Sequence, residues 1–483
     1  MIKKRLAFAV VVCLLSLNAV PVNPQVRRRT AASIRSEILE KNVRAELGFL
    51  ASDAMQGRGS GTNYERVAAE YIGSMFRQFG LEPAGDVDST SNKGFVQRVT
   101  LKSVKFLEPL TLTAGSGNEA KRWQFGRDFL VTGMRTPSVV GVLQIVEGDQ
   151  PPTKAAIALI RLPDGVNQQK RQELIRNARS AQAAAVVFLE TEANKAQRES
   201  GNVRFPTLQT RIAGERPPES FAVISVRKDI FDELATMANG TPVELKGPIQ
   251  DSDSNATWNA VGVLRGSDPT AVGEAIMLSA HLDHLGVLET ATGDQIFNGA
   301  DDDASGCVAV LELARVLAAG PQPRRTIYFV CFGSEERGGL GSRYFVDHSP
   351  VPLEKIVADV TFEMLGRPDA KVPPNTLWLT GYERSTLGPE LARRGARLVA
   401  DPHPEQNFFQ RSDNYVLALR GVVAHTVSSF GLHTDYHRPS DDLTKIDFPF
   451  MTRSINSLVA PMLWLANSSF RPAWLPGKQP TRN

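Results

Sequence analysis

The sequence contains little cysteine, and its net charge is close to zero. Three cysteines occur among 483 residues, and the two outside the amino-terminal segment, Cys307 and Cys331, are too few for a disulfide framework. Both stand in apolar stretches, so we expect small buried side chains rather than a bridge or a catalytic thiol. Lys and Arg total 55 against 52 Asp and Glu. Since this balance lacks the basic surface of a phosphate binder, no nucleic-acid partner is expected.

A membrane-spanning run is also missing. The apolar stretch Leu6–Leu17 is shorter than the ~20 residues that a spanning helix needs, so we expect no stable span in the mature chain. It follows the basic residues Lys3, Lys4 and Arg5, and this order is the pattern of a secretory signal peptide. We therefore predict a signal peptide over residues 1–25 and a secreted or periplasmic mature protein.

Three regions follow the predicted signal peptide. Residues 30–117 contain amphipathic helices predicted at Ile34–Leu50 and Tyr64–Gln78. Residues 118–240 alternate short apolar strands with helices and hold neither His nor Cys. We expect this segment to be a small α/β module that serves structure or substrate gating rather than catalysis. Gly247–Thr257, with its alternating Asp and Ser, is typical of a linker.

Residues 255–470 are expected to carry the chemistry. Apolar strands are predicted at Ala260–Leu264, Ala275–Ala280 and Thr326–Phe332, with a helix at Ala304–Ala319. Alternation of strands and helices predicts a largely parallel sheet covered on both faces. In such sheets ligands bind beyond the carboxyl ends of the strands, so functional side chains should gather at that edge.

A histidine and an aspartate follow the strand Ala275–Ala280. The stretch Ser-Ala-His-Leu-Asp-His ends at His284, and His281 and Asp283 lie on one face because alternate residues do so. The Asp283 carboxylate can then accept the second N–H of the His281 ring and strengthen it as a metal ligand. Taken alone, His-x-Asp is a weak motif that more often marks a surface histidine.

Three consecutive acids precede the predicted helix Ala304–Ala319, in the stretch Asn298–Gly306. They have two interpretations. They can cap the helix and benefit from its dipole, or Asp302 can bridge hard divalent cations from a rigid turn. In the second case Asp301 and Asp303 remain for capping and support.

Further acids and histidines stand at other predicted strand ends. Glu335 and Glu336 follow Thr326–Phe332 and precede a glycine-rich turn; because neighbouring side chains diverge, one can bind a metal while the other reaches an activated water. An acidic surface turn is the alternative. Glu363 lies in apolar surroundings, where an acid is costly unless paired or metal-bound. His433 and His437 share a loop.

Together these motifs resemble those of the co-catalytic di-zinc aminopeptidases, a family that includes secreted bacterial leucyl aminopeptidases and, more distantly, glutamate carboxypeptidase and the transferrin receptor. The similarity covers nearly the whole mature chain, since Phe49–Asp53, Gly57-Arg58 and Asn259–Gly266 also match family signatures. The segment 118–240 resembles the protease-associated domain often inserted in these enzymes. The resemblance implies an α/β fold: a zinc-exopeptidase αβα sandwich with a mostly parallel central sheet, plus the small inserted α/β domain.

The resemblance also implies a role for each motif residue. His281 and Glu363 would hold one zinc ion, Glu336 and His437 the other, Asp302 would bridge them, Asp283 would orient His281, and Glu335 would be the general base and acid. The cofactors are thus two zinc ions per chain, and cobalt or manganese can use the same nitrogen and oxygen ligands.

The chain departs from the family pattern in places. Many relatives carry Asp where Glu363 stands, and often Ser-Asp-His where this chain has Ser412-Asp413-Asn414. Some relatives place a tyrosine just before that motif to stabilise the oxyanion. Here Phe408-Phe409 occupies the region, which leaves Arg411 and Tyr415 as candidates for that role.

The function implied is that of a secreted metallo-exopeptidase that hydrolyses amino-terminal residues from peptide or protein substrates. Two alternatives stay open. One keeps the fold and changes the chemistry to that of a carboxypeptidase or a glutaminyl cyclase. The other is a non-catalytic, receptor-like protein, which has no need of metal ligands.

Overall fold

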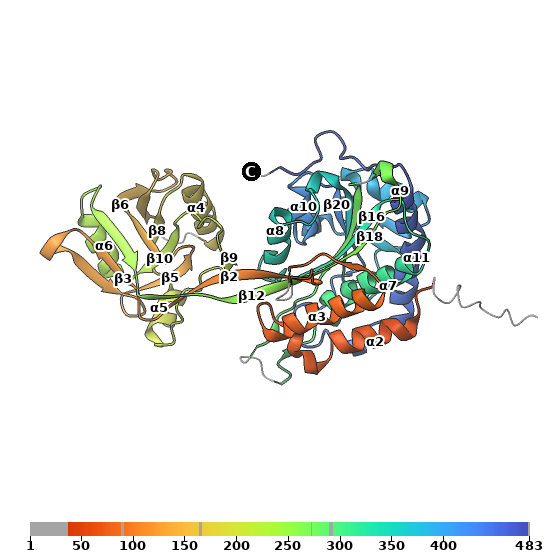
Figure 1. Cartoon of the computed structure of the whole chain (residues 1–483). Helices are drawn as coiled ribbons and strands as arrows, with labels where there is room; N and C mark the ends of the chain where they lie inside the picture. Colours follow the sequence, from red (N-terminus) through yellow and green to blue (C-terminus); the bar gives the residue numbers. More distant parts are fainter. Residues whose placement is uncertain (1–36, 88–90, 164–166, 272, 289–292, 482–483) are drawn as a thin grey trace, which may run out of the picture.

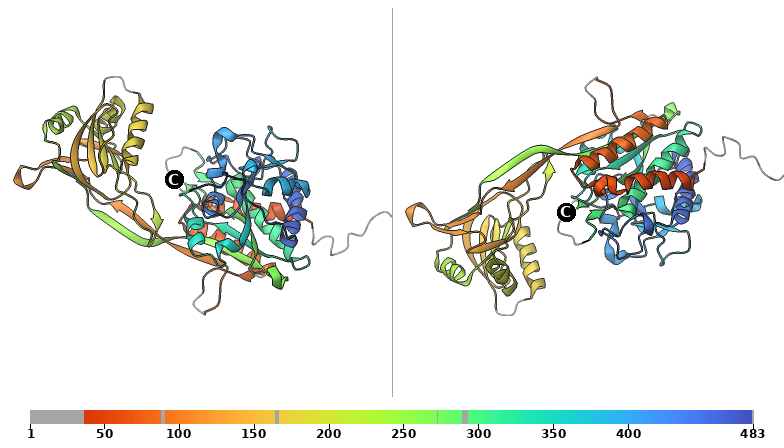
Figure 2. Two further views of the ribbon diagram at one scale, coloured as in Figure 1. Left: turned by 90° about the horizontal axis from the view of Figure 1, so that it is seen from above. Right: turned by 90° about the horizontal axis from the view of Figure 1, so that it is seen from below.

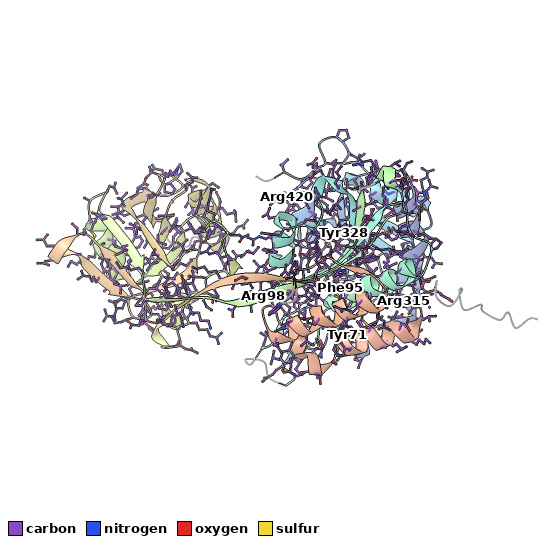
Figure 3. All side chains as sticks on the ribbon, in the orientation of Figure 1. Tyr71, Phe95, Arg98, Arg315, Tyr328 and Arg420 are labelled. Carbon is purple, nitrogen blue, oxygen red and sulfur yellow. The ribbon has the colours of Figure 1, made fainter. Side chains whose placement is uncertain are left out.

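The computed structural model describes residues 37–87, 91–163, 167–271, 273–288 and 293–481, and the predicted signal peptide at 1–25 lies outside them. Figure 1 shows two α/β bodies joined by a long two-stranded ribbon, and Figure 2 shows the same separation from above and below. Side chains fill both bodies, while Arg98 lies on the ribbon where it leaves the larger one (Figure 3). Among the described residues, no helix has the length and apolar character needed to cross a membrane.

The larger body is built on a ten-stranded mixed sheet. Its strand order is β19 (Leu398–Ala400), β18 (Leu377–Leu379), β20 (Ala424–Ser428), β17 (Ile356–Glu363), β13 (Ala275–His281), β16 (Thr326–Phe332), β12 (Ile249–Leu264), β2 (Val96–Phe106) and β9 (Arg211–Ile212), with β1 (Glu82–Pro83) paired to β12. The four central strands β16, β13, β17 and β20 are parallel. β12 and β2 are antiparallel to their neighbours, because one continues into the ribbon and the other returns from it.

Helices cover both faces of this sheet. On one face lie α2 (Glu40–Leu50), α3 (Asn63–Gln78), α7 (Gly306–Ala318), α9 (Leu387–Arg393) and α11 (Phe448–Asn467); on the other lie α8 (Leu340–Asp347) and α10 (Asn414–Ala418). Alternate residues of β13 divide between the two cores: Ile276 and Leu278 pack toward the first face, and Ala275 and Met277 toward the second. This follows from the twofold side-chain period of a strand. The predicted αβα architecture is confirmed.

The smaller body contains a separate eight-stranded sheet. Its order is β4 (Lys121–Gln124), β3 (Thr111–Ala114), β11 (Pro242–Lys246), β6 (Ser138–Glu147), β7 (Ala156–Arg161), β8 (Ala185–Leu189), β10 (Ala222–Val226) and β5 (Phe129–Met134). Its helices are α4 (Gln168–Ser180), α5 (Glu192–Glu199) and α6 (Lys228–Thr236). α4 and α6 pack on different apolar clusters. The sheet runs from Thr111 to Lys246 and so extends past both limits of the 118–240 segment.

The predicted linker at Gly247–Thr257 does lie in the connection between the two bodies, but it is a strand rather than an irregular segment. Ile249–Leu264 forms one continuous strand, β12, that pairs antiparallel with β2 from Ile249↔Phe106 to Ala260↔Val96. Polar residues are compatible with a strand here because the middle of the ribbon is exposed to solvent, with Lys102 and Asp251 forming an ion pair of 3.0 Å across it. Composition was a poor guide because a two-stranded ribbon has no buried face to require apolar alternation.

Cys307 and Cys331 are free and buried, as predicted.

A buried histidine has a consequence for stability. His425 on β20 is fully buried; its Nδ1 lies 2.7 Å from the carbonyl oxygen of Thr380, and its Nε2 lies 2.7 Å from the hydroxyl of Ser385. The neutral imidazole satisfies both contacts by donating to Thr380 and accepting from Ser385.

We expect stability to fall in acid because His425 must then be charged. Burial lowers the pKa of His425 to about 4, against about 6.5 in an unfolded chain. Since the unfolded state takes up the proton first, the stabilisation is complete above about pH 6.5 and is lost as the pH falls toward 4, by about 3 kcal/mol. Urea unfolding of the wild type and His425→Asn at pH 7 and pH 4 measures it. The free energy of unfolding of His425→Asn should change less between pH 7 and pH 4 than that of the wild type. The exposed His348→Asn should show the same change as the wild type. A change in His425→Asn equal to that of the wild type would contradict this role of His425.

Candidate metal centre and active site

The parallel strands of the larger sheet bring the predicted site residues to one edge. His281 is the last residue of β13, Glu363 is the last residue of β17, and Glu335 and Glu336 follow the end of β16. β13 pairs with both β16 and β17 in parallel register. The carboxyl ends of these strands therefore meet, and the expected position of the chemistry agrees with the structure.

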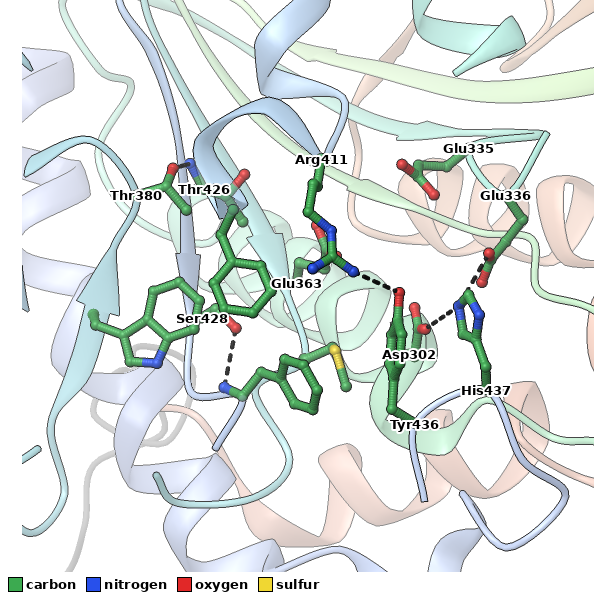
Figure 4. A pocket seen from close by; sticks show the side chains of 14 residues that line it. Asp302, Glu335, Glu336, Glu363, Thr380, Arg411, Thr426, Ser428, Tyr436 and His437 are labelled. Carbon is green, nitrogen blue, oxygen red and sulfur yellow. Dashed lines mark hydrogen bonds and ion pairs between the residues drawn. The ribbon is translucent and has the colours of Figure 1, made fainter. Parts of the chain in front are cut away.

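Two groups of donor atoms form at this edge. One consists of His281, Asp302 and Glu363, and the other of His284, Asp302, Glu336 and His437; within each group one ligand atom per residue lies within 4.8 Å of the others. All five predicted metal ligands are thus brought together, and Figure 4 shows four of them, Asp302, Glu336, Glu363 and His437. Asp302 belongs to both groups. Its Oδ1 lies 3.1 Å from Nε2 of His281, and its Oδ2 lies 3.2 Å from Nε2 of His437.

The loop that presents Asp302 is anchored through its backbone. The carboxylate of Asp441 accepts hydrogen bonds from the amides of Asp301 and Asp302, both at 3.1 Å. A Cβ at Gly299 would collide with the carbonyl of Asp302 and with the ring of His284, and φ of Gly299 is +57°. Only glycine fits this close approach without strain.

Asp303 serves the supporting role that was predicted for it. Its carboxylate accepts a hydrogen bond of 2.9 Å from the amide of Gly306 at the start of α7. It also accepts 3.1 Å hydrogen bonds from the amides of His281 and Met364. One buried carboxylate thereby ties the ends of β13 and β17 to α7. Asp301 in turn lies 3.1 Å from Nε2 of His433, so His433 supports the loop and belongs to neither donor group.

Asp283 contacts more than the ring that it was predicted to orient. Nδ1 of His281 lies 3.8 Å from its carboxylate and 3.2 Å from its carbonyl oxygen. The carboxylate accepts a closer hydrogen bond of 2.9 Å from the amide of Glu335, and one from the hydroxyl of Ser60. Asp283 therefore positions the Glu335 turn directly. Orientation of His281 by this carboxylate stays a prediction.

Glu335 differs from its neighbour Glu336. Glu336 is in a donor group and contacts His284 and His437, whereas Glu335 is in neither group and lines the adjacent pocket. Burial raises the pKa of the Glu335 carboxyl well above its usual range, and the carboxylates of Asp413 and Glu363 add to the effect. A carboxyl with a raised pKa next to a metal site suits proton transfer.

The shared aspartate shows the opposite shift. Burial acts to raise the pKa of Asp302, but the hydrogen bond with His281 and the neighbouring imidazoles hold that pKa well below its usual range. For His437, burial acts to lower the pKa, yet its contacts with Asp302 and Glu336 raise it to about 10. Each charged form is thus favoured by oppositely charged partners.

A pocket with aromatic walls opens beside the donor groups. It is a cavity of about 40 Å³ lined by Met364, Trp378, Phe408, Phe430 and Tyr436, by Thr380, Thr426 and Ser428, and by Arg411 next to the acidic residues (Figure 4). The Trp378 and Phe408 rings stack at 5.4 Å. The pocket is apolar enough to take a side chain and has polar groups at its ends.

The two candidates for oxyanion stabilisation lie in different places. Arg411 lines the pocket, with its guanidinium 5.0 Å from the centre of the Phe408 ring and its Nη2 3.5 Å from the Tyr436 hydroxyl. Tyr415 instead packs edge-on against Phe409, with ring centres 5.8 Å apart, and does not line the pocket. Its position in the pocket therefore favours Arg411 as the group that stabilises the oxyanion. The hydroxyl of Tyr436, in the same pocket, is a second candidate donor.

Sequence reasoning missed several contributors. His284 ends the stretch after the strand Ala275–Ala280, and Tyr436 lies in the loop of His433 and His437, but neither received a role. Two histidines within four residues was the signal available for His284. Glu65, on α3, accepts a 2.8 Å hydrogen bond from the amide of Ser334 and so steadies the Glu335 turn. No local pattern in the sequence links Glu65 to that turn, because the two are far apart along the chain.

The donor groups fit divalent metal ions. Their ligands are imidazole nitrogens and carboxylate oxygens, a set used by zinc and shared by cobalt and manganese. Three carboxylates, Asp302, Glu336 and Glu363, crowd one edge. Oε2 of Glu363 is buried and has no hydrogen-bond partner among the described residues. Bound cations would compensate the charge and satisfy that oxygen.

The fold and the site together define the class of zinc-exopeptidase-like α/β proteins. The structure is similar to the "Aminopeptidase from Aneurinibacillus sp. strain AM-1", with a TM-score of 0.53 and 19% identity over 93% of this chain and 99% of that chain. At this identity the likeness establishes the fold. Residues 259–461 match the model of peptidase family M28, which agrees with the resemblance seen in the motifs.

Curated relatives agree with this placement. "Leupeptin-inactivating enzyme 1" of Streptomyces exfoliatus is 35% identical over 121 residues, which cover 24% of this chain and 25% of that protein. "Aminopeptidase YwaD" of Bacillus subtilis (strain 168) is 25% identical over 316 residues, covering 65% of this chain and 60% of that protein. The chain thus matches a quarter of the length of the first relative and three fifths of the second.

Proposed function

We propose that the protein is a di-zinc metallopeptidase that removes amino-terminal residues from peptides. The observation that carries the proposal is the pair of donor groups sharing Asp302, with the unliganded carboxyl of Glu335 beside them at the mouth of a pocket. Two zinc ions held by these groups would supply Lewis acidity, polarising the scissile carbonyl and lowering the pKa of the attacking water.

The chain's own residues supply the proton transfers and the positioning. Glu335 takes the proton of the attacking water and delivers it to the leaving amine, a task that requires a carboxyl free of metal. Asp283 holds the Glu335 turn through the amide of Glu335. Arg411 and the Tyr436 hydroxyl face the reaction space from the pocket side, where a positive charge and a donor stabilise a developing oxyanion.

The pocket supports an exopeptidase. It is small, and the stacked rings of Trp378 and Phe408 lie in its wall, so it accommodates one apolar side chain rather than an extended stretch of substrate. The substrate class is therefore a peptide whose terminal residue enters this pocket. The relatives named aminopeptidases favour the amino terminus.

We also propose that the protein is exported, on the basis of Lys3–Arg5 followed by Leu6–Leu17. The smaller body is proposed to be a protease-associated domain, centred on residues 118–240. β9, from the same segment of the chain, joins the larger sheet by pairing with β2. Glu215, just after β9, pairs with Arg343 at the start of α8, a few residues beyond Glu336. These contacts support a role for the inserted domain in restricting access by long peptides.

A metal analysis with a substrate panel tests the proposal. The purified protein should contain two zinc ions per chain and release chromophore from amino-acyl substrates, with no cleavage of peptides blocked at the amino terminus. Cleavage of blocked peptides from the carboxyl end would indicate a carboxypeptidase, and pyroglutamate formation from amino-terminal Gln would indicate a cyclase. Metal-free protein with no turnover on any substrate would reject the enzyme and favour a receptor-like role.

A further inference from the structure

His284 lies inside one of the donor groups, although none of the motif assignments gives it a role. The side chain is fully buried. Its Nδ1 lies 2.8 Å from Oε1 of Glu336 and 3.8 Å from Oδ2 of Asp302. Nε2 has no hydrogen-bond partner among the described residues, so the polar surroundings of the ring are all on the Nδ1 side.

The backbone of His284 is held in place from the amino-terminal region. Its amide donates to the carbonyl of Arg58 at 3.2 Å, and its carbonyl accepts from the amide of Ser60 at 3.3 Å. Gly299 leaves room for the ring, because a Cβ there would collide with it. The backbone hydrogen bonds and the close packing at Gly299 therefore fix the orientation of the ring.

The distances within this group lie near those expected between ligands of one metal ion. At metal–ligand distances of 2.0–2.2 Å, neighbouring tetrahedral ligands lie roughly 3.3–3.6 Å apart. Nε2 of His437 lies 3.2 Å from both Oδ2 of Asp302 and Oε2 of Glu336. The corresponding contacts of His284 Nδ1, at 3.8 Å and 2.8 Å, lie on either side of this range. Both imidazoles thus face the same two carboxylates.

We infer that His284 binds, through Nδ1, the same metal ion as Asp302, Glu336 and His437, so that this site has four protein ligands. This inference rests on the proposed di-metal function. The other site, with His281, Asp302 and Glu363, keeps three. Four protein ligands close a zinc site, whereas three leave a position for water or substrate. The site at His281 is then the one that activates water, and the site at His284 holds its ion more tightly.

The alternative is a hydrogen bond alone, with Nδ1 donating to Oε1 of Glu336. His284 would then position Glu336 without binding the ion, and the two metal sites would have equal numbers of protein ligands. The two arrangements differ in the number of imidazoles on the tighter ion. That number is two for a ligand His284 and one for a positioning His284.

X-ray absorption of the wild-type protein separates these cases without any substitution. The fully loaded protein is dialysed against chelator until one zinc ion per chain remains, and the imidazole scattering of that ion is counted. Two imidazoles are expected. A single imidazole would overturn the assignment of His284 as a ligand.

Zinc competition with a chromophoric chelator provides the second measurement, on the wild type, His284→Ala and the control His348→Ala, whose histidine is exposed and belongs to neither group. His284→Ala should lower the zinc affinity of the tighter site at least ~100-fold, whereas His348→Ala should keep the wild-type affinity. Circular dichroism confirms that each variant is folded. Unchanged affinity in His284→Ala would also overturn the inference. Wild-type protein that binds no zinc would reject the proposed function itself. Two bound zinc ions with one imidazole each would instead reject only the assignment of His284 as a ligand.

Discussion

Glu335→Gln is expected to abolish most turnover while leaving both zinc ions bound. Glu335 belongs to neither donor group, yet it lines the pocket. Burial is the main reason that the pKa of its carboxyl is raised. Gln keeps the size and hydrogen bonds of the side chain but cannot take up a proton. Loss of a general base reduces kcat by about 10²–10⁴-fold. Steady-state kinetics on an amino-acyl chromogenic substrate, with metal analysis of the same preparation, measures both quantities.

The matched control for this change is Glu354→Gln, at an exposed position outside the site. It makes the same chemical substitution without touching the site, and its kcat should equal that of the wild type. Near-normal turnover in Glu335→Gln would remove Glu335 as the base. Loss of zinc from Glu335→Gln would instead indicate that Glu335 is a ligand.

Asp302→Ala should release both metal ions together. Its two carboxylate oxygens face different donor groups, Oδ1 toward His281 and Oδ2 toward His437. Removing the carboxylate takes one ligand from each group and leaves Glu336 and Glu363 less compensated at close range. A shared ligand therefore makes the two occupancies depend on each other. We expect less than one zinc ion per chain in the purified variant and no detectable hydrolysis.

The control for this substitution is Asp294→Ala, which removes an exposed carboxylate outside the site and should retain two zinc ions. Because loss of metal could also follow from unfolding, the melting temperatures of metal-free Asp302→Ala and metal-free wild type are compared. Similar values would assign the loss to the missing ligand. Two zinc ions in a folded Asp302→Ala protein would contradict the bridge.

Local sequence patterns were sufficient for most elements. The helix predicted at Tyr64–Gln78 is α3 at Asn63–Gln78, and the strand predicted at Thr326–Phe332 has those limits as β16. Apolar periodicity identifies such elements because each has one face or both faces in a core. The same signal is absent from Gly247–Thr257, where the ribbon strand β12 is exposed at Ile249–Asp251 and at Asn255.

Site residues were predictable where they immediately follow a strand. His281, Glu335, Glu336 and Glu363 all stand at the ends of apolar runs, and parallel pairing brings those ends together. Glu65 was not predictable, because it supports the Ser334 amide from a helix distant in sequence. His284 was not assigned because the direction of a side chain after a strand end depends on its packing, here against Gly299.

The amino-acid sequence by itself determined the family resemblance, the donor residue types and the edge of the sheet where they meet, because these follow from strand ends and from the chemistry of carboxylates and imidazoles. Only the tertiary structure decided which donors face one another: Asp302 between two groups, His284 beside Glu336, and Arg411 rather than Tyr415 in the pocket. Distances between side chains from separate elements depend on how those elements pack, and no local pattern encodes them.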